Sequence, residues 1–275
     1  MKKKVAVGII LVLLIIYLIS FFSYRTTPKI AIIEIHGVIS DFYTHIQNIE
    51  SAESDDSIKA VVLSVDSPGG TVGAAQEIYR ALEKLRAKKP VVVSMGNVAA
   101  SGGYYISAPG SVIYANPGTI TGSIGVIIQH MDLSRILDKL GIKVENIKSG
   151  KYKDILYPNK SLSPEQKRLI EDTIKDVYDQ FLDAIVRYRP ITKEQLRPYA
   201  DGRIFSGRQA QKIKLVDKLG NIQDAVNEAR KLAGLEDRHV IIVKLGKRKN
   251  ILEKLLNSEM ESIITKSGIY YMLSF

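Results

Sequence analysis

The chain has 275 residues, 45% hydrophobic and 25% charged, which is enough apolar content to bury a core and excludes a disordered or fibrous protein. Part of the net charge of +10 comes from basic residues around the apolar N-terminal segment, and the rest is dispersed among acidic residues, so we expect a solvated surface and no nucleic-acid partner. The absence of cysteine excludes a disulfide framework, a thiolate metal site and a cysteine nucleophile.

Residues 5–22 form an uncharged apolar run of about the length that crosses a bilayer core. A cleaved signal peptide usually ends in small residues, whereas this run ends in Phe21 and Phe22. The sequence therefore predicts a transmembrane signal anchor within residues 1–25. Lysines before the run outweigh the basic residues after it, which predicts a single-pass cell-membrane protein with a cytoplasmic N-terminus and the remainder of the chain, residues 26–275, on the extracytoplasmic side.

Apolar strand-like runs then alternate with helical patterns. We expect strands at residues 29–37, 59–67, 90–96, 111–115, 122–131, 142–150 and 239–246. Helices are expected from residue 38 to about 52 and at 74–88, 133–141, 163–189, 206–212 and 221–233. Continuous apolar strands between helices indicate an α/β domain with a buried, largely parallel sheet. We place this domain at residues 26–240 and a C-terminal extension at residues 241–275.

Ser101 stands between two alanines and two glycines, in a stretch at residues 94–110 that follows three strand-like valines. Small residues allow a sharp backbone bend and the approach of a substrate carbonyl, while the N–H of Gly102 can donate to a developing oxyanion. The same pattern is compatible with an ordinary helix N-cap. The stretch is therefore a candidate nucleophile turn.

A second corner, SVDSPGG at residues 64–70, lies where an expected strand ends. Glycine tolerates positive φ, so the N–H groups of Gly69 and Gly70 can turn inward toward an oxyanion, although Pro-Gly-Gly is also typical of a simple turn. Thr121, Gly122 and Ser123 form another corner of small residues.

A serine nucleophile needs a base to accept its proton. Among the four histidines, only His130 lies near the Ser101 turn in the sequence. A lysine can also serve, because burial lowers the pKa of an ammonium group. Lys151 and Lys153, in the sequence SGKYKDILYP, are the candidates, and the adjacent tyrosines could shield either of them.

Five blocks in order carry a resemblance to a known family: SVDSPGG, NVAASGGYYISAPG, NPGTITGSIGVI, SGKYKD and ADGRIFSGRQAQKIKLVDKLG. Over residues 30–235 the chain resembles signal peptide peptidase A, the Ser-Lys membrane proteases of the protease IV family, in their short single-domain form. The resemblance implies a ClpP/crotonase-like α/β fold behind an N-terminal anchor. It also implies cleavage of signal peptide remnants and other apolar peptides in or near the membrane, without a metal or nucleotide cofactor.

Matched to the family's motifs, Ser101 is the nucleophile, Lys153 the general base and Ser123 the serine that orients the lysine. Gly70 and the N–H of Gly102 match the oxyanion hole, with Gly69 as the alternative to Gly70. In double-length family members the lysine and the serine lie in different tandem halves. The resemblance therefore implies a homo-oligomeric ring in which neighbouring subunits share each active site.

Two other functions have to be compared with peptide hydrolysis. Crotonases bind acyl-coenzyme A on the same fold, but they usually transfer protons with carboxylates, and the only acid close to a glycine corner is Asp66. A non-catalytic membrane-anchored scaffold is the second alternative, and the presence of both Ser101 and Lys153 disfavours it. The apolar C-terminal tail, SGIYYMLSF, either packs against the protein or occupies the catalytic groove, where it could be trimmed.

Overall fold

The computed structural model of the chain describes residues 12–15, 17, 26–246 and 270–272. The strands of the main sheet are β1 (Lys29–His36), β2 (Ile58–Ser67), β4 (Val91–Ala100), β5 (Val112–Ala115), β6 (Ile120–Gly122), β7 (Ile204–Ser206), β8 (Lys218–Leu219) and β9 (Ile241–Leu245). The strands β3 (Gly69–Thr71) and β10 (Tyr270–Met272) form a separate pair.

The helices are α2 (Tyr43–Ser54), α3 (Val72–Lys88), α4 (Gly102–Ser107), α5 (Ser134–Lys139), α6 (Pro164–Val186), α7 (Lys193–Leu196), α8 (Gly207–Lys212) and α9 (Ile222–Leu232), with a 3₁₀ turn at Arg197–Tyr199. The main sheet has the order β7-β6-β4-β2-β1-β9, and β5 pairs with both β4 and β8. Its pairings are parallel except for the antiparallel pair of β6 and β7. The predicted α/β domain with a largely parallel sheet is therefore confirmed.

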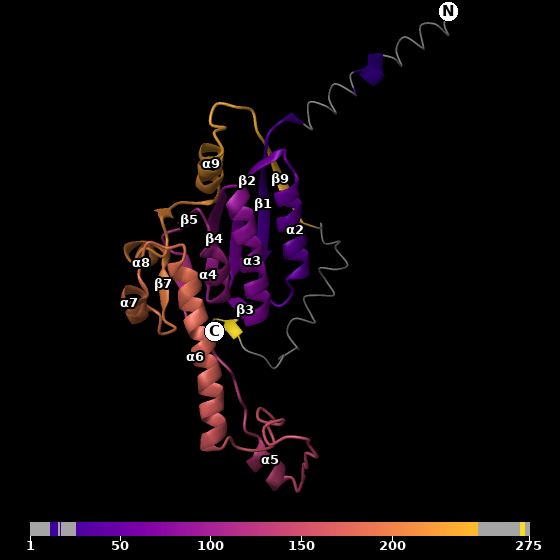
Figure 1. Ribbon diagram of the computed structural model, residues 1–275, viewed down its shortest axis with the longest axis vertical. Coiled ribbons are helices and arrows are strands. Elements are labelled where there is room, and N and C mark those ends of the chain that lie inside the picture. The colour runs from indigo at the N-terminus through magenta and orange to yellow at the C-terminus, as the bar shows by residue number, and fades with distance from the viewer. Residues whose placement is uncertain (1–11, 16, 18–25, 247–269, 273–275) are drawn as a thin grey trace, which may run out of the picture.

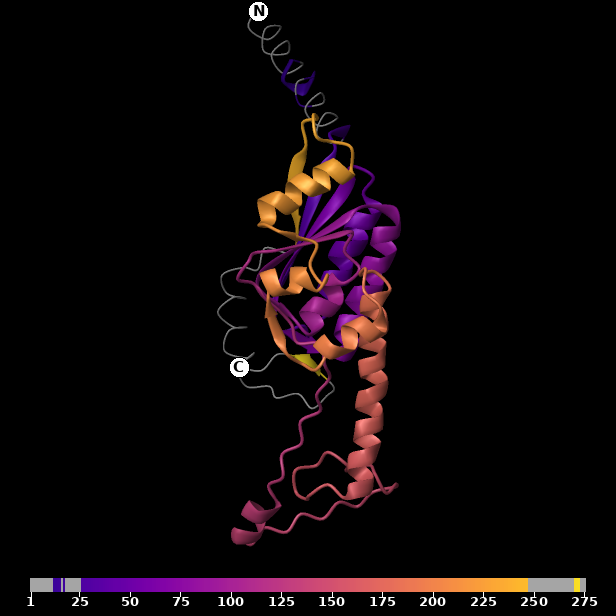
Figure 2. The same ribbon diagram turned by 90° about the vertical axis from the view of Figure 1, so that its left-hand side faces the viewer.

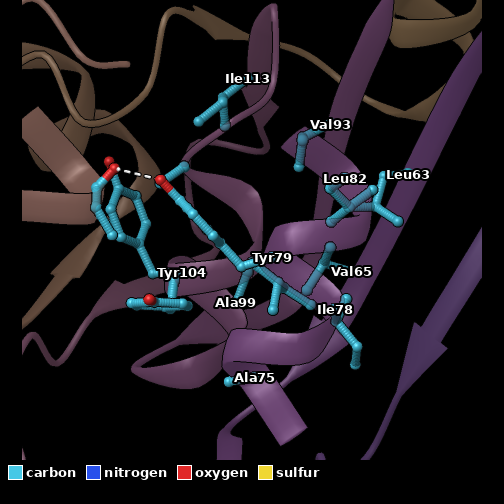
Figure 3. Close-up of a cluster of buried hydrophobic side chains, with 14 of the residues drawn as sticks. Leu63, Val65, Ala75, Ile78, Tyr79, Leu82, Val93, Ala99, Tyr104 and Ile113 are labelled. Atoms are coloured by element: carbon cyan, nitrogen blue, oxygen red, sulfur yellow. Dashed lines mark hydrogen bonds between the residues drawn. The ribbon is translucent and has the colours of Figure 1, made fainter. Parts of the chain in front are cut away.

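Helices cover both faces of the sheet, which explains its continuous apolar strands (Figure 1). Successive side chains of a strand point to opposite faces, so Leu63 and Val65 of β2 pack in the cluster with α3 and α4, whereas Val62 packs in the cluster with α9. Figure 3 shows the first of these clusters. The C-terminal half of α6 joins it, with Phe181 fully buried against the ring of Tyr105 in α4.

The segment at residues 127–160, here called the arm, extends away from the sheet and returns to the N-terminal end of α6 (Figure 2). The strand predicted at residues 122–131 is wrong apart from its first residue, which ends β6, and the strand predicted at residues 142–150 is wrong throughout. Their apolar residues mimic a strand pattern, but side chains such as Ile142, Val144 and Ile147 are exposed on the arm. An apolar pattern forms a strand only where a neighbouring strand pairs with it.

Both ends of the chain bear on the expected domain boundaries. Strand β9 pairs with β1, so the main sheet continues beyond residue 240 to Leu245. The predicted signal anchor at residues 5–22 lies almost entirely outside the described residues. Among those that are described, no helix has the length and apolar character needed to span a bilayer.

Candidate active site

Ser101 lies in a strained turn between the end of β4 and the start of α4. Its φ is 53° and its ψ is −116°, a conformation that L-residues rarely adopt, and its surface is only 1% exposed. The backbone is held on both sides, since Ser101 N donates to Gly122 O at 2.8 Å and Tyr105 N donates to Ser101 O at 2.8 Å. Strain that the surrounding structure maintains in this way is typical of functional residues.

The Pro-Gly-Gly corner lies beside this turn. Helix α4 begins against the end of β2, where a side chain at Gly103 would place its Cβ 2.6 Å from Ser67 O. The N–H of Gly69 donates to Ser67 Oγ at 3.1 Å, so that donor already has a partner. Gly70 lies so close to the backbone of Ile39 that a Cβ added at Gly70 would be 1.9 Å from Ile39 O. Of the two glycines at this corner, Gly69 thus has its N–H engaged by Ser67, whereas the backbone of Gly70 packs against that of Ile39.

Ser123 lies on the other side of the Ser101 turn, just after β6. It has φ 49° and is 7% exposed, and its N–H donates to Arg203 O at 2.8 Å. Ser101 and Ser123 both face a cleft of about 440 Å³. The other residues that line this cleft are Gly125, Val126, Ile127, Ile174, Tyr178, Ala200, Asp201 and Gly202. The structure thus brings the two predicted serines to one partly apolar cleft.

The carboxylates near the cleft are already paired. Asp201 accepts two hydrogen bonds from the Arg203 guanidinium, at 2.7 and 2.6 Å, which lower the pKa of its carboxyl to about 2. Asp66 Oδ1 accepts from Val98 N at 3.0 Å, and its Oδ2 accepts from Asn97 Nδ2 at 2.9 Å. Neither acid is arranged as a free proton carrier, which disfavours crotonase-type chemistry. Within the described part of the chain, no three His, Asp or Glu side chains are grouped as a metal ion would require.

Lys153 lies on the arm and is exposed. It is not among the residues that line the Ser101 cleft. Its neighbours Lys151 and Tyr152 contact Glu165 in the first turn of α6. At a rise of 1.5 Å per residue, Glu165 lies about 14 Å along the helix from Ile174, which lines the cleft. One chain therefore does not bring Lys153 and Ser101 together.

The segment around Lys153 is organised by its neighbour Asp154, which is 5% exposed. The Asp154 carboxylate accepts from Lys148 Nζ at 2.5 Å, Lys160 Nζ at 2.7 Å and Asn146 Nδ2 at 3.1 Å. Hydrogen bonds from the two lysines hold the pKa of the Asp154 carboxyl well below its ordinary value. The turn that presents Lys153 is thus built around a buried carboxylate whose charge is balanced by two lysines.

The two alternative bases also lie on the arm. Lys151 Nζ lies 2.6 Å from Glu165 Oε2, and this hydrogen bond raises the pKa of the Lys151 ammonium. His130 Nε2 lies 3.2 Å from the carbonyl oxygen of Tyr157. Neither residue lines the Ser101 cleft.

The C-terminal tail adds a strand beside the glycine corner. The backbone of β10 runs antiparallel to β3, with Tyr270, Tyr271 and Met272 opposite Thr71, Gly70 and Gly69 (Figure 1). The chain's own C-terminal segment therefore lies in extended form along the Gly69–Thr71 edge. This pairing is compatible with both expectations for the tail, packing against the protein and occupation of the catalytic groove.

Several residues of the cleft were not predicted from the sequence. Ile174 and Tyr178 belong to a helix whose start is more than sixty residues after Ser101, and their apolar spacing indicates only a buried helix face. Asp201 and Gly202 fall in one of the five family blocks, which was the only sequence signal for them. The role of Tyr178 in shaping the cleft is visible only in three dimensions, where its hydroxyl donates to Ala200 O at 2.7 Å.

Comparison with known families identifies the enzyme class. A sequence profile of Peptidase family S49 matches residues 83–236, which is more than half of the chain. The chain belongs to peptidase family S49. A profile described as Clp protease matches residues 23–119, in agreement with the ClpP-like α/β fold.

Individual relatives agree with this assignment. The chain is 39% identical to "Putative protease slr0021" of Synechocystis sp., over 90% of this chain and 91% of the relative. It is 35% identical to "Putative signal peptide peptidase SppA" of Enterococcus faecium, over 80% of this chain and 68% of the relative. It is 37% identical to "Protease 4" of Salmonella typhi, over 81% of this chain and 38% of the relative. The resemblance inferred from the five blocks is confirmed, and the protein is a serine peptidase.

Proposed function

We propose that the protein is a membrane-anchored endopeptidase whose Ser101 and Lys153 form a dyad across the interface of two subunits, and that it degrades cleaved signal peptides and other apolar peptides. The observation that carries the proposal is the strained, buried Ser101 turn, which lies beside a glycine corner and opens to a partly apolar cleft. Membership of a peptidase family supports peptide hydrolysis as the reaction.

Ser101 Oγ attacks the carbonyl carbon of the scissile peptide bond while the neutral amine of Lys153 accepts the hydroxyl proton. The N–H groups of Gly70 and Gly102 donate to the oxyanion that forms. Gly102 is the first residue of α4, so its N–H has no acceptor within the helix. Lys153 then protonates the leaving amine, and the peptide C–N bond breaks to leave an acyl-enzyme.

Water completes the reaction. With Lys153 as the base, a water molecule attacks the acyl-enzyme carbonyl, and the ester bond to Ser101 Oγ breaks as the proton returns to the serine. Ser123 orients the lysine amine by a hydrogen bond in the assembled site. Its position on the wall of the Ser101 cleft supports this role.

The separation of the dyad within one chain supports a shared site. Lys153 is exposed on the arm, and its turn is rigidly organised around Asp154, as expected of a residue that is presented to another molecule. The arm also exposes an unusual number of large apolar side chains, which a contact with a second copy would cover. They include Ile127, Met131, Ile136, Leu140, Ile142, Val144 and Ile147. A homo-oligomeric ring places the arm of each subunit on the cleft of the next.

The substrate binds as an extended strand along β3. The antiparallel pairing of β10 with β3 supports this, because it shows that the Gly69–Thr71 edge accepts a peptide backbone next to Gly70. Val126, Ile127 and Ile174 give the cleft an apolar wall. Such a wall favours the apolar side chains of signal peptides over charged ones.

Residues 5–22 anchor the protein in the cell membrane as a single-pass segment. Their uncharged apolar sequence supports the anchor, and the preceding lysines support a cytoplasmic N-terminus with an extracytoplasmic peptidase domain. An anchor of this kind would hold the cleft close to the membrane in which signal peptide remnants remain.

The proposal is tested by turnover of short apolar fluorogenic peptides over a range of pH. Wild type, Ser101→Ala and Lys153→Ala are compared, with oligomeric state measured for each. We expect wild type to cleave and both variants to be inactive at every pH tested. Retained activity in Lys153→Ala would exclude this lysine as the base. A folded wild-type oligomer that cleaves none of the peptides would favour the alternative of a non-catalytic scaffold.

A further inference from the structure

Strand β4 changes its neighbour just before it reaches Ser101. Residues Val92 to Met95 pair with β5, whereas Val98 to Ala100 pair with β6. On its other side β4 pairs with β2 from Val91 to Met95 and again at Ala99. The register shifts between these pairings, so that Val65 lies opposite Met95 and Ser67 lies opposite Ala99. From the first of these pairs to the second, β2 advances by two residues and β4 by four. The two extra residues of β4 form a bulge at Gly96 and Asn97.

A bulge leaves backbone groups without ladder partners, and here side chains from both neighbouring segments supply them. On one side, Asp66 of β2 accepts from Val98 N at 3.0 Å and from Asn97 Nδ2 at 2.9 Å. On the other side, the hydroxyl of Thr119 donates to Gly96 O at 2.6 Å. A Cβ at Gly96 would lie 3.0 Å from Asp66 Cγ, so the glycine leaves room for the carboxylate.

The same acid connects the two halves of the site. Asp66 immediately precedes Ser67, whose Oγ accepts from the N–H of Gly69 and so shapes the glycine corner. Through Val98, Asp66 also fixes the last residues of β4 before Ser101. A contact between a side chain of β2 and the backbone of β4 therefore links the segment that leads to Ser101 with the segment that leads to Gly70.

We propose that Asp66 is a positioning residue for catalysis, which sets the placement of the Ser101 nucleophile relative to the oxyanion donor Gly70 by holding the β4 bulge. The inference rests on the proposed role of Ser101 as the nucleophile. The carboxylate itself does not line the Ser101 cleft, so the proposal gives it no role in proton transfer. A misplacement of about 1 Å between a nucleophile and its target can cost about 10²-fold in rate.

The test measures kcat and KM of the full-length protein in detergent with an apolar fluorogenic peptide. We expect Asp66→Ala to lower kcat by about 10- to 100-fold with little change in KM, because peptide binding along β3 is retained while the attack geometry is lost. Asp66→Asn should restore most of the activity. Its amide oxygen can accept from Val98 N, and its NH₂ group can donate to the side-chain oxygen of a reoriented Asn97.

A matched control separates positioning from loss of stability. Asn221→Ala removes the N-cap of α9 on the other face of the sheet and should lower the melting temperature without changing kcat. If Asp66→Ala does not fold, Asp66→Glu replaces it, because the longer side chain displaces the acceptor and should lower kcat in the same way. A wild-type kcat in the folded Asp66 variant, or an equal decrease in Asn221→Ala, would overturn the inference.

Ser101→Ala, measured in parallel, distinguishes a failure of the nucleophile assignment from a failure of the positioning role of Asp66. An active Ser101→Ala protein would remove the nucleophile assignment and the Asp66 inference with it. An inactive Ser101→Ala protein together with a fully active Asp66→Ala protein would overturn the positioning role alone.

Discussion

Lys151 and Glu165 form an ion pair, with 2.6 Å between Nζ and Oε2, where the arm meets the first turn of α6. The hydroxyl of Tyr152 donates to the same carboxylate. These contacts hold the Lys153 segment at the exposed end of α6, whereas the Ser101 cleft contacts the helix at Ile174 and Tyr178. A single helix therefore separates the two proposed members of the dyad.

Lys151→Ala and Lys153→Ala should differ sharply in activity. The hydrogen bond from Lys151 to Glu165 raises the pKa of the Lys151 ammonium, which disfavours this lysine as the base. We expect Lys153→Ala to lower kcat by about 10²- to 10⁴-fold, the usual contribution of a general base, and Lys151→Ala to retain most of its activity. Steady-state kinetics of the two variants test this difference, and equal losses of kcat would contradict the assignment of Lys153 as the base.

Gly70→Ala should damage both the oxyanion hole and the fold. Its Cβ would lie 1.9 Å from Ile39 O, a backbone atom that cannot move aside easily. We expect a loss of about 1–3 kcal/mol in the free energy of unfolding and about 10²- to 10³-fold in kcat. The matched control is Gly73→Ala in the first turn of α3, where an added Cβ meets no atom within 4 Å. Thermal melts and kinetics that failed to separate the two variants would contradict this role for Gly70.

The sequence predicted the parts of the fold that depend on local patterns. The run Val91, Val92 and Val93 indicated a buried strand, and the small residues around Ser101 indicated a sharp turn, which has φ 53° in the structure. The patterns failed on the arm. There the apolar residues at 142–150 suggested a strand, but no neighbouring strand within the described chain pairs with them.

Long-range contacts explain what the sequence could not provide. The contact of Asp66 with Val98 joins residues 32 positions apart and forms only because β2 and β4 are neighbours in the sheet. The separation of Lys153 from Ser101 likewise depends on the path of the arm along α6. The pairing of lysine with serine was inferred from a family resemblance, since spacing along the chain contains no information on which subunit supplies each residue.

Asp154→Asn should loosen the turn that presents Lys153. The Asp154 carboxyl has a pKa below its ordinary 3.8 because Lys148 and Lys160 donate to it, so the cluster is stabilising above that pH and the stabilisation is lost as the pH falls through the lower folded pKa. Hydrogen exchange at residues 146–160 should be faster in Asp154→Asn at pH 7 than in wild type. Exposed Asp138 on α5 provides the control, and equal exchange in Asp138→Asn and Asp154→Asn would contradict a specific role.

Removal of residues 270–275 should relieve competition for the β3 edge. The tail pairs with Gly69–Thr71, the edge at which we expect the substrate to bind, and a tethered segment has a high effective concentration. The truncated protein should therefore show a lower KM for short peptides with an unchanged kcat, and an unchanged KM would argue against competition.

The same tail could also be a substrate. Trimming predicts a shorter intact mass for the active protein than for Ser101→Ala, and identical full-length masses for the two proteins would exclude it.

The most direct test of the shared site mixes inactive subunits. Ser101→Ala subunits keep Lys153, and Lys153→Ala subunits keep Ser101, so a mixed oligomer contains some interfaces at which an intact serine meets an intact lysine. Each variant alone should be inactive, and co-assembly should restore a substantial fraction of the wild-type turnover of an apolar peptide. No recovery in oligomers that mass spectrometry shows to be mixed would contradict a dyad formed between subunits.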